Sequence, residues 1–133
     1  MLGACSGGTQ SSSEYGSDAR LATRLERIVT DASPGAVIPL WAMTDFEWDS
    51  VYVLDAFAPL AERARALEGI TVGAGDLKYS YGEGTLLYFV QDSVVVRLID
   101  DYGGDVPASD GPLPNTVEIR QDTNGSGLIM VVP

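Results

Sequence analysis

The side chains best suited to chemistry lie around Trp48, where several carboxylates surround an aromatic residue. The possible carboxylate partners of Asp49 are Asp45, Glu47 and Asp55. Two carboxylates with different pKa values can act as general acid and general base, as in glycoside hydrolysis. In the structural alternative, Trp48 packs in the core and Asp49 accepts N–H groups where the chain enters a strand. We favour the structural interpretation, because nothing in the sequence marks one of these carboxylates as desolvated.

The segment FEWDSVYV, residues 46–53, resembles a motif of small uncharacterised bacterial lipoproteins, Phe-x-Trp-Asp-x-Val-Tyr-(Val/Ile)-Phe-x-Pro-Tyr. The matching residues are Phe46, Trp48, Asp49, Val51, Tyr52 and Val53. The chain then departs from the motif, because residues 54–59 (LDAFAP) replace its last part. The resemblance covers a minor part of the chain and implies no activity. It makes Phe46, Trp48, Asp49 and Tyr52 candidate functional or structural residues.

The chain has one cysteine, Cys5, at the end of the sequence Leu2-Gly3-Ala4-Cys5. This stretch resembles a bacterial lipobox, and the resemblance implies cleavage before Cys5 and attachment of lipid to its sulfur. Gly3 and Ala4 are small, as residues at secretory cleavage sites generally are. Residues 5–17 are mostly small and polar, so we expect a flexible tether there. The alternative is a disordered N-terminus with an accidental cysteine.

The signal ahead of Cys5 is incomplete in this sequence. A signal peptide also needs a basic region and an apolar region of roughly 7–15 residues. Only Met1 and Leu2 precede the small residues, so we expect either a start further upstream or a Met1 that is not the native start. Residues 1–4 would be the end of the signal. The resemblance then implies a domain outside the cytoplasm, attached to the membrane of the bacterial cell envelope by lipid on Cys5.

Length and charge limit the function classes. The 133 residues suit one domain, which we expect over residues 18–133. The net charge of -11 repels phosphate groups, which argues against nucleic acid and anionic headgroups as partners. The chain has no histidine, the commonest general base and a common zinc ligand. We expect neither cofactor nor metal, since residues 122–127 imitate half an EF-hand loop but Pro133 stands where its glutamate belongs.

The apolar pattern predicts helices early and strands late. A first helix is expected over residues 18–32, followed by an edge strand at 36–40 that contains Pro39 and a central strand at 51–54. A short second helix follows Pro59 and ends near Gly69, with Leu60, Ala61, Ala64 and Leu67 as its apolar stripe. Two hairpins are expected, one formed by 84–90 and 93–99 and one by 116–121 and 128–132.

These elements predict an α+β fold, with two short helices and then a mainly antiparallel sheet of about five or six strands. Our leading hypothesis is a non-catalytic, lipid-anchored envelope domain that presents its sheet and acidic loops to an unknown protein or small ligand. One alternative is an envelope hydrolase that uses carboxylates near Trp48 and Asp49. Another is an inhibitor of an envelope enzyme, which suits a small acidic domain but has no supporting motif.

Overall fold

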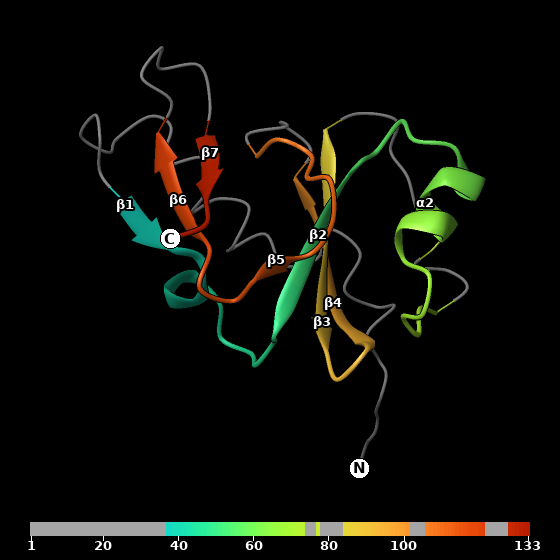
Figure 1. The fold of residues 1–133 in the computed structure, drawn as a ribbon, viewed down its shortest axis with the longest axis horizontal. Helices are drawn as coiled ribbons and strands as arrows, with labels where there is room; N and C mark the ends of the chain where they lie inside the picture. The colour runs from blue at the N-terminus through green and yellow to red at the C-terminus, as the bar shows by residue number, and fades with distance from the viewer. Residues whose placement is uncertain (1–36, 74–76, 78–83, 102–105, 122–127) are drawn as a thin grey trace.

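Seven strands in two antiparallel sheets make up most of the described structure (Figure 1). The computed structural model describes residues 37–73, 77, 84–101, 106–121 and 128–133. The elements are β1 (Val37–Pro39), the 3-10 helix η2 (Leu40–Met43), β2 (Ser50–Asp55), α2 (Leu60–Ala66), β3 (Thr85–Gln91), β4 (Val94–Asp101), β5 (Leu113–Pro114), β6 (Glu118–Gln121) and β7 (Leu128–Val131). The large sheet has the order β4-β3-β2-β5, and the small sheet has the order β1-β6-β7.

Strands β2 and β3 form the centre of the large sheet. They pair antiparallel along the whole of β2, with Ser50 opposite Val90 and Asp55 opposite Thr85. Neighbouring side chains on a strand point to opposite faces of the sheet. Both faces are covered here, since β3 is buried at every residue from Thr85 to Val90. The expected central strand at residues 51–54 is therefore confirmed.

Two hydrophobic cores lie on the two faces of the large sheet. The first core joins alternate residues of β2 and β3 to η2 and the small sheet. Its buried members are Leu40, Met43, Trp48, Val51, Val53, Leu87, Phe89, Ile99, Val106, Val117, Ile119 and Leu128. The second core lies on the face that α2 covers, and its buried members are Leu54, Ala56, Leu67, Leu86, Tyr88, Val90, Val95 and Leu98.

Helix α2 is shorter and less buried than its sequence predicts. Pro59 occupies the N-cap and Gly69 has a φ of 86°, so the expected ends are close to the observed ones. The expected apolar stripe, however, does not face the core as a whole, because Leu60, Ala61 and Ala64 are exposed. Only Arg63 of the helix proper is buried, together with Leu67 at its C-cap.

The expected arrangement of two short helices followed by one sheet of five or six strands is wrong. The described residues contain seven strands in two sheets, one α-helix and one 3-10 helix, and two of the strands precede α2. The physical reason is pairing across long separations. The hairpin β6–β7 pairs with β1 near the other end of the described chain, and not with the hairpin β3–β4.

Several expectations fall on residues outside the described ranges. These are the lipobox with Cys5, the tether at 5–17, the first helix at 18–32 and the turn at 122–127. Other local expectations are confirmed. Pro39 lies in β1 at the edge of the small sheet, and both expected hairpins form with antiparallel pairing.

The turn between β3 and β4 has two residues, Asp92 and Ser93, with φ values of 53° and 65°. Two-residue turns with positive φ at both positions favour Asn-Gly or Asp-Gly, since side chains other than Asn and Asp are strained there. The carbonyl of Ser93 also accepts a hydrogen bond from the Thr71 N–H at 2.8 Å. Ser93 therefore holds a left-handed conformation that serine rarely adopts.

We expect Ser93→Gly to stabilise the fold by up to about 1 kcal/mol, because it removes this backbone strain and keeps the Thr71 hydrogen bond. The measurement is the midpoint of thermal unfolding followed by circular dichroism. Ser50→Gly is the matched control, because the same change within β2 should lower the midpoint. Lower midpoints for both variants would contradict the expectation.

Candidate functional site

The residues singled out by the motif divide between two hollows. Phe46, Trp48 and Asp49 line one hollow, and Tyr52 lines the other. Trp48 joins the first core and Tyr52 packs against the second. Regular alternation would place residues four apart on the same face, so the division arises because Trp48 lies before β2, which begins at Ser50. The structure therefore does not bring the four residues together in one site.

Trp48 has a structural position. Only 5% of its surface is exposed, and its ring meets the ring of Phe89 edge to face, with centroids 4.9 Å apart. Phe46 makes a second edge-to-face contact with Phe89 at 5.1 Å. The guanidinium carbon of Arg97 lies 4.4 Å from the centroid of the Phe46 ring, a cation–π contact. These contacts fix the orientation of the aromatic rings beneath the hollow.

Asp49 binds the turn between β3 and β4. Its Oδ2 accepts a hydrogen bond from the Asp92 N–H at 2.9 Å, and its Oδ1 accepts one from the Ser50 hydroxyl at 3.2 Å. These contacts agree with the structural interpretation of Asp49. Within the described ranges, no group of three or more His, Cys, Asp or Glu side chains could hold a metal ion.

The first hollow, which we call the Trp41 hollow, has a volume of about 390 Å³. Its lining residues are Trp41, Thr44, Phe46, Glu47, Trp48, Asp49, Gln91 and Asn115. Trp41 lies on η2 with 59% of its surface exposed, which is unusual for so large an apolar ring. Three of the motif residues thus line one hollow. No pattern in the sequence singles out Trp41 or Asn115 as their neighbours there.

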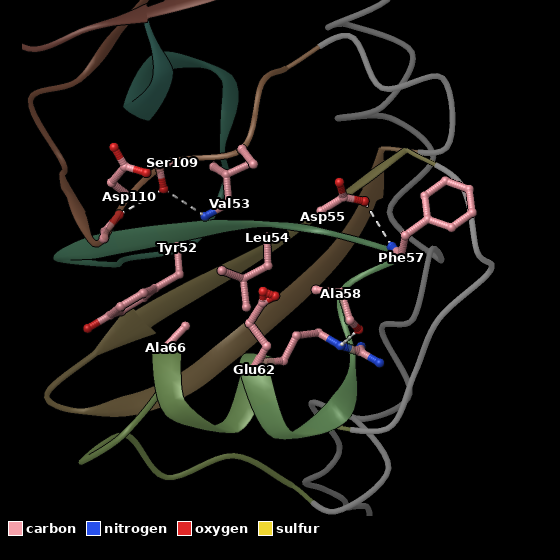
Figure 2. A pocket seen from close by; sticks show the side chains of 13 residues that line it. Tyr52, Val53, Leu54, Asp55, Phe57, Ala58, Glu62, Ala66, Ser109 and Asp110 are labelled. Carbon is pink, nitrogen blue, oxygen red and sulfur yellow. Dashed lines mark hydrogen bonds between the residues drawn. The ribbon is translucent and has the colours of Figure 1, made fainter.

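The second hollow, which we call the α2–β2 pocket, has a volume of about 490 Å³ and opens between α2, β2 and residues 108–111 (Figure 2). Its lining residues are Tyr52, Val53, Leu54, Asp55, Phe57, Ala58, Glu62, Arg63, Ala66, Ala108, Ser109, Asp110 and Gly111. Figure 2 shows Leu54 and Glu62 pointing towards each other between the strand and the helix, with Tyr52 and Phe57 at opposite ends.

Hydrogen bonds hold the walls of the α2–β2 pocket. Ser109 closes the edge of β2, because its N–H donates to the Val53 carbonyl at 2.8 Å and its hydroxyl accepts from the Val53 N–H at 3.2 Å. On the opposite side, Nε of the buried Arg63 donates to the Ala58 carbonyl at 3.1 Å. The first pair of bonds fixes the loop to the strand, and the Arg63 bond fixes α2 to the turn that precedes it.

The lining of the α2–β2 pocket combines apolar and acidic groups. The acidic residues are Asp55, Glu62 and Asp110, and Arg63 is the basic one. Phe57 is exposed over 70% of its surface at one end of the pocket. Large exposed aromatic side chains are typical of binding surfaces, where they supply apolar area with little loss of conformational freedom.

Sequence reasoning missed most of this pocket. Ser109 and Asp110 come after β4 in the chain. The hydrogen bonds that join Ser109 to Val53 of β2 form only in the tertiary fold, which no local pattern predicts. One signal was available, since Phe57 stands between Asp55 and Pro59 in a turn, where an apolar ring has little to pack against.

No family model, curated protein or solved structure matches this chain. Among the described residues, no helix has the length and apolarity that a membrane span requires.

We expect Asp49→Ala to destabilise the fold by about 1 kcal/mol, because the Asp92 N–H and the Ser50 hydroxyl lose their acceptor. Asp49→Asn should lose less stability than Asp49→Ala, since the amide oxygen of asparagine can still accept one of these hydrogen bonds. The measurement is chemical unfolding in urea. Glu47→Ala removes a nearby exposed carboxylate that accepts no hydrogen bond from the described residues, so it should leave stability unchanged. A loss for Glu47→Ala equal to that for Asp49→Ala would contradict the assigned role.

Proposed function

We propose that this protein is a non-catalytic, lipid-anchored domain of the bacterial cell envelope, which binds a small ligand in the α2–β2 pocket. The observation that supports binding most directly is the pocket itself. Its volume of about 490 Å³ lies within the range of small-molecule sites, roughly 300–1,000 Å³. Its apolar surface comes from Tyr52, Leu54 and Phe57, and polar groups converge from α2 and the 108–111 segment.

The residue types around the pocket favour binding over catalysis. The chain has no histidine, and the pocket is lined by no cysteine or lysine among the described residues. Asp49, the residue on which the hydrolase alternative depends, accepts hydrogen bonds through both carboxylate oxygens and lines the other hollow. A carboxylate so engaged supports the local fold, so we do not propose the hydrolase.

The anchoring part of the proposal rests on the resemblance of residues 2–5 to a lipobox. A lipid anchor also suits the charge of the chain, because a net charge of -11 would hinder electrostatic attachment to anionic headgroups. A tether over residues 5–17 would hold the domain away from the membrane and leave the α2–β2 pocket open to solutes. The ligand would then be a small molecule of the compartment outside the cytoplasm.

Filling the α2–β2 pocket should abolish binding of a small apolar probe. We expect Nile red, a neutral dye, to bind the wild-type protein with an increase in fluorescence. The Ala66→Phe variant should lose most of this increase. Ala64→Phe is the matched control, since Ala64 is also an exposed alanine of α2 but does not line the pocket. Equal fluorescence with both variants would contradict the proposed site.

Anchoring can be tested separately by lipid labelling. The chain is produced in bacteria with a basic and apolar export segment fused ahead of Leu2, and the cells are fed radiolabelled palmitate. We expect the protein to be labelled and Cys5→Ser to be unlabelled. The double variant Cys5→Ser/Ser12→Cys restores a thiol outside the Leu-Gly-Ala-Cys context and should stay unlabelled. Labelling of Cys5→Ser would show that the anchoring proposal is wrong.

A further inference from the structure

The Trp41 hollow is a second candidate site, independent of the α2–β2 pocket. Three aromatic residues contribute to its lining, namely Trp41, Phe46 and Trp48. Of these, Trp41 exposes 59% of its surface and Trp48 only 5%, so Trp41 presents the accessible ring. Burying an exposed tryptophan against a ligand is a common source of binding energy.

Some of the hydrogen-bond donors of the hollow are engaged within the protein. The Trp48 Nε1–H donates to the Thr44 hydroxyl at 3.0 Å, and that hydroxyl donates to the Trp41 carbonyl at 3.0 Å. The Asn115 side-chain amide donates to the Trp48 carbonyl at 3.2 Å. Gln91, the indole N–H of Trp41 and the second N–H of the Asn115 amide are the further donors of the lining, beside the acceptors and ring surfaces.

The charge of the lining is negative. Glu47 and Asp49 are both exposed carboxylates, and none of the described lining residues is basic. Asp49 accepts two hydrogen bonds, but a carboxylate has about four lone-pair positions and can accept further contacts. A neutral sugar gains no attraction from this charge, whereas a cation is attracted by both the negative charge and the ring faces.

A cation of the protein itself already occupies one of these rings, so Phe46 is not available to a ligand cation. The Arg97 guanidinium lies over Phe46 at 4.4 Å, and it is not one of the described residues that line the hollow. Tryptophan is the ring that binds cations most strongly, and aromatic rings are the usual partners of quaternary ammonium ligands. A nearby carboxylate adds Coulomb attraction for the cation. The hollow combines one accessible tryptophan with two such carboxylates.

From these contacts we propose that the Trp41 hollow binds an organic ammonium group. The Trp41 ring supplies the cation–π contact, and Glu47 and Asp49 supply the negative charge. Because η2 is tied to the residue before β6, and Asp49 is tied to β3 and to the β3–β4 turn, the hollow is formed before the ligand arrives. The Leu40 N–H donates to the Val117 carbonyl at 3.0 Å, and the Asp49 N–H donates to the Val90 carbonyl at 2.8 Å.

The test compares choline with 3,3-dimethylbutan-1-ol, which has nearly the same shape and no charge, by titration of ¹H–¹⁵N spectra of the full chain. We expect choline to bind roughly five- to tenfold more tightly, from a cation–π contact and one screened charge pair. The shifts should centre on the indole N–H signals of Trp41 and Trp48 and the side-chain amide of Asn115.

Variants separate the ring from the charge. Trp41→Ala should abolish choline binding, and Trp41→Phe should bind with intermediate affinity, since phenylalanine is a weaker cation–π partner. Glu47→Gln should weaken choline binding and leave the neutral alcohol unchanged. Glu68→Gln is the matched control, because it removes an exposed carboxylate that lines neither hollow. Far-UV circular dichroism verifies that each variant is folded.

Three results with the wild-type protein would overturn the proposal. They are equal affinity for choline and the alcohol, tighter binding of methyl glucoside than of choline, or no choline binding at all by the wild-type protein. Loss of choline binding in Ala66→Phe would place the site in the α2–β2 pocket, which also contradicts the inference. The Nile red experiment is unaffected by Trp41 variants, so failure of this inference is distinguishable from failure of the proposed function.

Discussion

Six consecutive residues of β3 are buried, which requires both faces of the large sheet to be covered. Antiparallel sheets commonly leave one face to solvent, so this burial is the constraint on which the remaining structure depends. The small sheet and η2 cover one face, and α2 with the chain that follows it covers the other. Each hollow lies where one of these covers meets β2 or the turns beside it.

The two covers differ in how closely they pack. The first core joins two sheets and includes Trp48 and Phe89, whose rings meet edge to face. On the other face, α2 contributes only Arg63 and the capping Leu67 to the buried set. A short helix held at so few points leaves room beside the strand, and this incomplete packing is the origin of the α2–β2 pocket.

Local patterns in the sequence predict the strands well and their arrangement poorly. The run from Val51 to Leu54 is apolar on both faces, and it forms an internal strand as expected. Pro39 correctly marks an edge strand. The pairing of β1 with β6 could not be predicted, because register between segments so distant depends on the assembled core and not on nearby residues. The stripe of α2 was misjudged because alanine is equally suited to exposed and buried helix positions.

Local patterns also predict the candidate sites only where the lining residues are neighbours in the chain. Phe46, Trp48 and Asp49 were singled out from the sequence and do lie in one hollow, since they are neighbours in the chain. Tyr52 lies in the other, because those three residues precede β2 and the regular alternation of faces begins only at Ser50. Ser109 enters its pocket through hydrogen bonds to Val53, a contact between residues far apart in the sequence.

Proline shapes the borders of both sheets. β5 ends the large sheet with only two residues, one of them Pro114, and β1 ends the small sheet with Pro39. Proline lacks the N–H that another strand would need, so these borders are poor templates for strand addition by a second molecule. The opposite borders, β4 and β7, contain no proline, so there the mutual repulsion of chains that each carry a charge of -11 is what opposes strand addition.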